Sequence, residues 1–217
     1  MDLHPIKTLL MPLDLQGRLI TADALHTQTD TARYLVEEKG ADYLFTVKDN
    51  QPTLQEHLKA LREEDFSPGA YPPEKAHGRV EIRTLQTSTR LNDYLDFPYV
   101  GQVARVTRQR LSVKGSETST ETVYLITSLA EERADPKRLL ALNRGHWAIE
   151  NRLHWVRDVT FDEDRSTVRT RQGPRLMASL RNLAISLLRL IGTVNLAAKL
   201  RELAAKPYKI LLRFLGV

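Results

Sequence analysis

In the first third of the chain, apolar and polar residues group into short blocks that predict an α/β sheet. Residues 18–23 (RLITAD) form a short apolar run with two β-branched side chains, which predicts a buried strand. Residues 26–40 follow a helical pattern, with Gly40 standing where a C-terminal cap is expected. A second apolar run at 42–47 (DYLFTV) predicts another strand. A strand, a helix and a strand with short joints predict a parallel crossover.

The pattern changes after a predicted helix at 52–61. A segment rich in Pro and Gly, residues 66–78, separates this helix from three runs of β character at 79–85, 99–111 and 121–128. Apolar and charged residues alternate in the first run, as expected of a half-exposed strand. The sequence VKGSE around Gly115 predicts a hairpin turn between the other two runs. We therefore expect an antiparallel β insertion in the α/β domain.

The last part of the chain has a helical pattern. Asp135 is the expected N-cap with Pro136 in the first turn, and breaks are predicted near Gly173 and Gly192. The fold class predicted is α/β, a partial RNase H-like domain with an antiparallel β insertion and a helical C-terminal region. We divide the chain into a partial α/β core at 1–66, a β-rich insertion at 67–134 and a helical part at 135–217.

Charge is distributed unevenly along the 217 residues. Residues 1–135 carry 16 Lys and Arg against 21 Asp and Glu, whereas residues 136–217 carry 16 against 6, which gives −5 and +10. The basic C-terminal part favours a polyanionic partner such as DNA, and the alternative is a basic surface that only contacts solvent. The absence of cysteine excludes disulfides and thiolate metal sites. Without a secretory signal or an apolar run of ~20 residues, we expect a soluble cytoplasmic protein with no membrane partner.

One short segment, residues 146–158 (HWAIENRLHWVRD), concentrates side chains capable of chemistry. On a helix, Glu150, His154 and Arg157 lie along the edge of one apolar stripe, with His146 nearby. Glu150 could ligate a divalent metal beside a nucleic-acid backbone; the alternative is a structural glutamate paired with Arg157 or a histidine. Zinc is disfavoured because the two histidines lack the H-E-x-x-H spacing.

Five segments resemble, in order, sequence blocks of the DDE transposases of bacterial insertion sequences. They are GRLITADALHTQ, ADYLFTVKDNQPTL, HGRVEIRTL, RGHWAIENRLHWVRDVTFDED and LMASLRNLAISLLR. Within these enzymes the chain resembles the ISAs-one group of the IS-four-like superfamily, over most of its length from about residue 10. The resemblance implies an RNase H-like fold whose acidic triad binds two Mg²⁺ or Mn²⁺ ions. Asp23 matches the second aspartate of that triad, and Glu150 matches its glutamate.

The same blocks suggest residues that hold DNA. These candidates are Lys48, Asn50, His77, Arg79, Arg144, His146, Trp147, Asn151, His154 and Arg157. Arg157 falls roughly where related transposases carry a lysine, whereas Asn143 stands at the family's tyrosine position. The arginines of DRSTVRTRQGPR are further candidates to follow DNA, with a solvated loop as the alternative.

The family's first aspartate has no counterpart here, because only 22 residues precede Asp23, and Asp2 and Asp14 lie in other blocks. We expect an N-terminally truncated transposase, either a fragment or a decayed gene, with weakly bound metal and little activity alone. An open sheet edge would favour pairing with another chain.

The resemblance also implies an oligomer, because transposases act as assemblies on paired DNA ends. One alternative function is a non-catalytic DNA-binding remnant that modulates an intact transposase by mixed assembly. Another is an unrelated metal hydrolase of small substrates, which fits the basic C-terminal part poorly.

Overall fold

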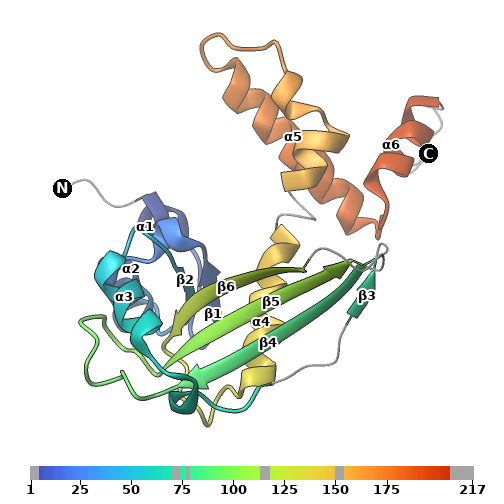
Figure 1. The fold of residues 1–217 in the computed structure, drawn as a ribbon. Coiled ribbons are helices and arrows are strands. Elements are labelled where there is room, and N and C mark those ends of the chain that lie inside the picture. Colours follow the sequence, from blue (N-terminus) through green and yellow to red (C-terminus); the bar gives the residue numbers. More distant parts are fainter. Residues whose placement is uncertain (1–4, 70–73, 77–78, 113–117, 150–153, 206–217) are drawn as a thin grey trace. The chain divides into compact units, whose positions relative to one another are not determined.

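The computed structural model describes residues 5–69, 74–76, 79–112, 118–149 and 154–205 (Figure 1). The chain forms two compact units, Met1–His146 and Trp147–Val217. The α/β fold class is confirmed by a mixed sheet in the first unit, and the second unit is helical. No described helix is both long enough and apolar enough to cross a membrane.

The first unit is built on a six-stranded sheet in the order β1-β2-β6-β5-β4-β3. Strand β1 (Leu19–Ala22) pairs in parallel with β2 (Asp42–Val47). The chain between them forms a 3-10 turn η1 (Ala24–His26), helix α2 (Thr29–Arg33) and a π-helical turn η2 (Tyr34–Glu38). The parallel crossover predicted from the sequence is therefore confirmed.

The remaining strands are antiparallel. They are β3 (Glu74–Ala76), β4 (Arg79–Ser88), β5 (Gln102–Ser112) and β6 (Thr118–Thr127). Strands β4, β5 and β6 were predicted, whereas β3 lies in the segment predicted as a linker. Strand β6 also pairs with β2, so that Leu44 lies opposite Thr127. The strands expected as an insertion thus continue the same sheet as β1 and β2. The predicted turn around Gly115 lies outside the described residues.

Successive residues of β2 point to opposite faces of the sheet and enter two hydrophobic clusters. Tyr43 and Phe45 pack with residues of α2, η2 and helix α3 (Pro52–Ala60). Leu44 packs on the other face, where helix α4 (Pro136–Ile149) contributes Leu139 and Leu140. Figure 1 shows α4 running across this face of the sheet. Two short helical segments complete the unit, α1 (Pro5–Leu10) and η3 (Glu63–Asp65).

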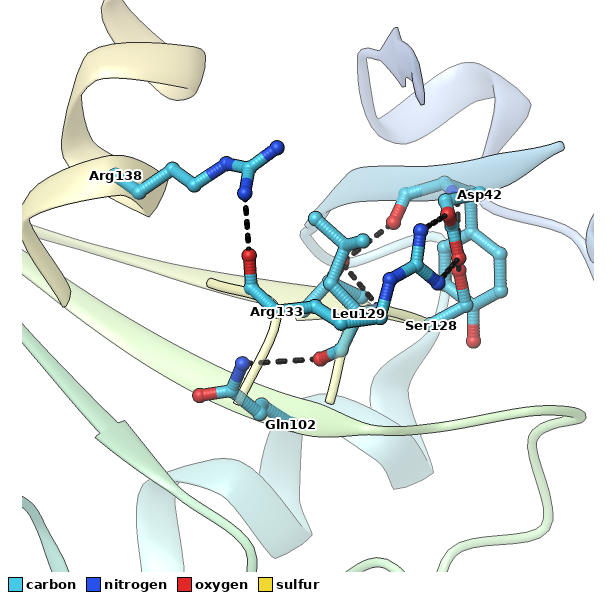
Figure 2. A network of polar contacts seen from close by, with 8 residues as sticks. Asp42, Gln102, Ser128, Leu129, Arg133 and Arg138 are labelled. Carbon is cyan, nitrogen blue, oxygen red and sulfur yellow. Dashed lines mark hydrogen bonds and ion pairs between the residues drawn. The ribbon is translucent and has the colours of Figure 1, made fainter. Parts of the chain in front are cut away.

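A network of polar contacts fixes the connection from β6 to α4 (Figure 2). Asp42, at the start of β2, accepts hydrogen bonds from both terminal nitrogens of Arg133, at 3.1 and 2.5 Å. The same carboxylate accepts a 2.9 Å hydrogen bond from the Ser128 hydroxyl. Arg138, in the first turns of α4, donates to the Arg133 carbonyl oxygen at 2.6 Å. These contacts therefore hold the start of α4, through Arg133, near the first residue of β2.

The second unit consists of helical segments around a small apolar cluster. Its elements are a π-helical turn η5 (Val156–Thr160), a 3-10 turn η6 (Glu163–Arg165), helix α5 (Gly173–Leu190) and helix α6 (Leu196–Ala205). The buried residues of the cluster are Val156, Ile185, Leu188 and Leu196. The predicted breaks near Gly173 and Gly192 are confirmed, the first at the start of α5 and the second between α5 and α6.

Candidate functional site

Asp23 directly follows β1, at the carboxyl end of a parallel pair of strands. It precedes η1, and its side chain makes no capping hydrogen bond to that turn. The residue is exposed, and its carboxylate has no hydrogen-bond or ion-pair partner among the residues that the structure describes. The carboxyl ends of parallel strands are a common place for functional side chains. Asp23 is thus available to bind a cation or a ligand.

Hydrogen bonds from neighbouring segments hold the loop after β1. The Asn50 amide donates to the Ala24 carbonyl oxygen at 2.6 Å, and the Gln51 amide donates to the Thr27 carbonyl oxygen at 2.8 Å. The buried Thr27 hydroxyl donates to the Thr46 carbonyl oxygen in β2 at 2.7 Å. These bonds fix the backbone that carries the aspartate, as a binding residue requires.

Sequence reasoning missed Thr27 and Gln51 as parts of this arrangement. Their importance arises only when β1 and β2 pair in parallel and bring the two following loops together. Asn50, a predicted DNA contact, donates a hydrogen bond from its amide nitrogen to the Ala24 carbonyl oxygen. The signal that could have found Gln51 is the run of polar residues 48–51 directly after β2, whereas no such run follows β1 to mark Thr27.

Helix α4 contacts β1 close to Asp23. The Nδ1 atom of His146 lies 3.1 Å from the Thr21 hydroxyl oxygen, at hydrogen-bond distance, and the imidazole is partly buried. Both residues belong to the first unit. The face of α4 that carries His146 is therefore turned toward the strand that ends before Asp23. Glu150 follows His146 by four positions in the sequence and lies outside the described residues.

The other predicted DNA contacts are spread over both units. Lys48, just after β2, and Arg144, in α4, are exposed in the first unit, and His154 is exposed in the second. Arg79 begins β4, and Trp147 lies near the end of α4. His77 and Asn151 lie outside the described residues.

Arg157 forms an ion pair that the sequence analysis did not identify. Its Nε and Nη2 atoms donate to the two carboxylate oxygens of Glu163 at 2.5 and 2.8 Å. The hydrogen bonds from Arg157 hold the pKa of the Glu163 carboxyl below its usual range. The sequence left open a DNA contact or a pairing with Glu150; the observed partner is Glu163.

No group of three Asp, Glu or His side chains that could hold a metal ion occurs within the described parts of the chain. The carboxylate of Asp23 is of the kind that binds Mg²⁺, and a metal site there would need further ligands beyond the described residues. The oxygen-donor chemistry of this residue fits a hard divalent cation.

The mixed sheet with flanking helices is consistent with the RNase H-like domain of a DDE transposase, and the Transposase DDE domain family matches residues 2–187. The chain belongs to this family.

Three curated relatives from Escherichia coli support this assignment. Two from strain K12, "Putative protein YbfL" and "H repeat-associated putative transposase YhhI", are each 32% identical over 199 residues, covering 86% of this chain and 51% of the relative. "Putative transposase YncI" of strain O157:H7 is 32% identical over 199 residues, covering 87% of this chain and 50% of the relative. The chain spans about half the length of these relatives.

Proposed function

We propose that this chain is the C-terminal part of a DDE transposase, in which Asp23 and Glu150 supply two carboxylates of a metal site for DNA cleavage and strand transfer. The observation that carries the proposal is the exposed Asp23 carboxylate, without a partner in the described part of the chain, on a loop fixed by hydrogen bonds. Membership of the transposase family supports the proposal that this carboxylate is a metal ligand.

Asp23 and Glu150 would hold the metal through oxygen atoms, which suits Mg²⁺ or Mn²⁺. Such ions, when bound in a pair, activate the attacking oxygen and stabilise the leaving oxygen of a phosphodiester displacement. The contact between His146 and Thr21 supports a role for the end of α4, because it keeps this helix on β1. Lys48 and Arg144 are exposed and would contact the DNA phosphates.

Two carboxylates fix a pair of cations poorly, because the remaining ligands must come from a third acid, water and phosphate. We therefore propose that the chain alone binds metal weakly and cleaves DNA slowly or not at all. Its partners would be the ends of the transposon DNA and, in a mixed assembly in the cytoplasm, an intact transposase.

A second candidate function is a non-catalytic DNA-binding remnant. It is favoured by the charge of +10 on residues 136–217 and by the exposure of Arg169, Arg171 and Arg175. A remnant of this kind would bind DNA equally well with and without divalent metal. It would retain that binding when Asp23 is replaced.

Metal binding by the chain tests the first proposal without requiring activity. Paramagnetic Mn²⁺ should broaden NMR signals from the loop after β1, and the broadening should be lost in Asp23→Asn and reduced in Glu150→Gln. Asp14→Asn is the matched control, because Asp14 is also exposed in the first unit but lies before β1. Equal broadening in all three variants would overturn the assignment of the metal carboxylates.

A plasmid-nicking assay separates the two candidate functions. Nicking that requires Mg²⁺ or Mn²⁺ and disappears in Asp23→Ala and Glu150→Ala would support the catalytic function. DNA binding without nicking, in a chain that also fails to bind Mn²⁺, would leave the DNA-binding remnant as the function.

A further inference from the structure

The carboxylate of Glu163 is shared by two arginines of the second unit. Arg157 uses Nε and Nη2 to bind both carboxylate oxygens, at 2.5 and 2.8 Å. The Nη1 atom of Arg181 lies 3.7 Å from Oε1, the oxygen that also accepts from Nη2 of Arg157. Two positive side chains therefore face one negative side chain.

The single carboxylate satisfies the two guanidinium groups unequally. The distance from Arg181 to Oε1 is too long for a hydrogen bond, and no other carboxylate of the described residues lies within 4.0 Å of Arg181. A guanidinium group binds carboxylate and phosphate in the same bidentate manner, through two parallel N–H groups. Arg157 and Arg181 thus have the chemistry of a site for a phosphate oxyanion.

Glu163 is carried by an element with little buried surface. No residue of η6 is buried, whereas Val156 of η5 and Ile185 of α5 belong to the apolar cluster. Asp162, directly before Glu163, has a left-handed backbone with φ of 50°, which is a strained conformation for a residue with a side chain. Segments with few buried contacts open at a low cost in free energy. Glu163 can therefore leave the two arginines while η5 and α5 remain packed.

The chain that follows Glu163 is rich in exposed cations. They are Arg165, Arg169 and Arg171, in the connection to α5, and Arg175, in the first turn of α5. A cluster of positive charge raises the local concentration of a polyanion such as DNA. Phosphate groups held by these arginines would compete with Glu163 for Arg157 and Arg181.

We propose that Arg157 and Arg181 form a phosphate-binding site that Glu163 occupies in this structure, and that a backbone phosphate of DNA replaces the Glu163 carboxylate when DNA binds. Glu163 is then an internal competitor that lowers the affinity of the second unit for DNA. The inference rests on the proposed function, because it takes DNA as the partner, but it does not require metal binding or DNA cleavage.

Fluorescence anisotropy of a labelled duplex with the whole chain tests this competition. E163Q should bind the duplex about fivefold or more tightly than E202Q, because two further guanidinium groups become available to phosphate. E202Q is the matched control, since it removes the same charge from an exposed carboxylate of the same unit. Adding R181Q to E163Q should cancel most of the gain in affinity.

A measurement on the unmodified chain avoids any loss of folding in the variants. The NMR signal of the Arg157 Nε–H group should shift when the duplex is added, because its acceptor changes from a carboxylate to a phosphate. Inorganic phosphate is the comparison, at the same total concentration of phosphate groups. An equal shift with inorganic phosphate would mean that the site takes free phosphate, which would overturn the assignment to DNA.

The outcomes separate this inference from the proposed function. If E202Q binds the duplex and E163Q binds it no more tightly, the competition by Glu163 is overturned while the affinity for DNA stands. An Arg157 signal that stays unchanged at saturating duplex overturns it as well. If neither the unmodified chain nor any variant binds the duplex, the inference and the proposed affinity for DNA both fail.

Discussion

At the residue scale, Glu163 connects three elements of the second unit through one carboxylate. Glu163 itself lies in η6, while Arg157 lies in η5 and Arg181 lies in α5. Arg157 binds both carboxylate oxygens, and Arg181 approaches one of them at 3.7 Å. All three side chains are mostly buried, with 20%, 29% and 11% of their surface exposed in the order named. A partly buried, bidentate pair of this kind is stronger than an exposed one.

Replacing Glu163 by Gln should destabilise the second unit by about 1–3 kcal/mol, because two guanidinium groups lose their anionic partner. Urea unfolding followed by tryptophan fluorescence measures this effect selectively, since both tryptophans of the chain, Trp147 and Trp155, belong to the second unit. Glu202→Gln is the control. Glu202 is 58% exposed and pairs only with Lys199 among the described residues, so its loss should cost less than about 1 kcal/mol.

The stability difference between the unmodified chain and Glu163→Gln should also depend on pH. Hydrogen bonds from Arg157 lower the pKa of folded Glu163 below its ordinary value of 4.5. The stabilising effect is therefore fully present above pH 4.5 and is lost as the pH falls through the lower pKa of the folded state. The difference in stability between the unmodified chain and Glu163→Gln should be constant near neutral pH and shrink in acid. A difference that stays constant in acid would contradict the ion-pair explanation.

The partner of Arg157 could not be found from helical periodicity. A wheel places Arg157 beside Glu150 and His154, whereas the observed partner follows it by six positions and lies beyond the end of η5. The chain reaches that partner through a left-handed residue, Asp162, with φ of 50°. An aspartate tolerates this conformation, but the pattern of apolar residues does not predict it.

At the scale of secondary-structure elements, local patterns predicted most strands and helices. β1, β2 and α3 follow from short apolar runs, turn residues and the proline at the start of α3. The pairing of β2 with β6 did not follow, because it joins residues about 80 positions apart and depends on the whole sheet. The π-helical turns η2 and η5 were also missed, since an inserted residue in a helix leaves little trace in the periodicity.

The buried Gln102 shows how one polar side chain joins elements. Its amide donates to the carbonyl oxygens of Leu129 and Ala134, each at 2.9 Å, and none of its surface is exposed (Figure 2 draws the bond to Leu129). These carbonyl groups belong to the connection that leads from β6 into α4. The bonds therefore hold the helix start on the sheet, at the opposite end of α4 from His146.

Gln102→Leu should destabilise the first unit by about 2–4 kcal/mol, because two buried carbonyl groups lose their donor. Urea unfolding followed by circular dichroism at a wavelength dominated by the sheet measures this change. Gln109→Leu is the matched control, since Gln109 lies on the same strand and is exposed. If both substitutions have the same small effect, Gln102 does not anchor the connection.

At the scale of the whole molecule, the two units differ strongly in charge. Met1–His146 carries 19 Lys and Arg against 21 Asp and Glu, and Trp147–Val217 carries 13 against 6, which gives −2 and +7. Asp23 and its supporting hydrogen bonds belong to the nearly neutral unit. The net positive charge is concentrated in the other unit, so we expect that unit to contribute most of the affinity for a DNA backbone.

The salt dependence of DNA binding tests this expectation. The triple variant R169A/R171A/R175A should weaken binding to duplexes of any sequence. It should also reduce the slope of log affinity against log salt by about 0.9 for each DNA phosphate that the variant no longer neutralises. The control R18A/R33A/R62A removes the same charge from exposed positions in the first unit and should leave the slope nearly unchanged. Fluorescence anisotropy with a labelled duplex at several salt concentrations gives both slopes. If both variants weaken binding equally, the affinity for DNA depends only on the net charge of the chain. If only R169A/R171A/R175A weakens binding, the DNA-binding surface lies in the second unit.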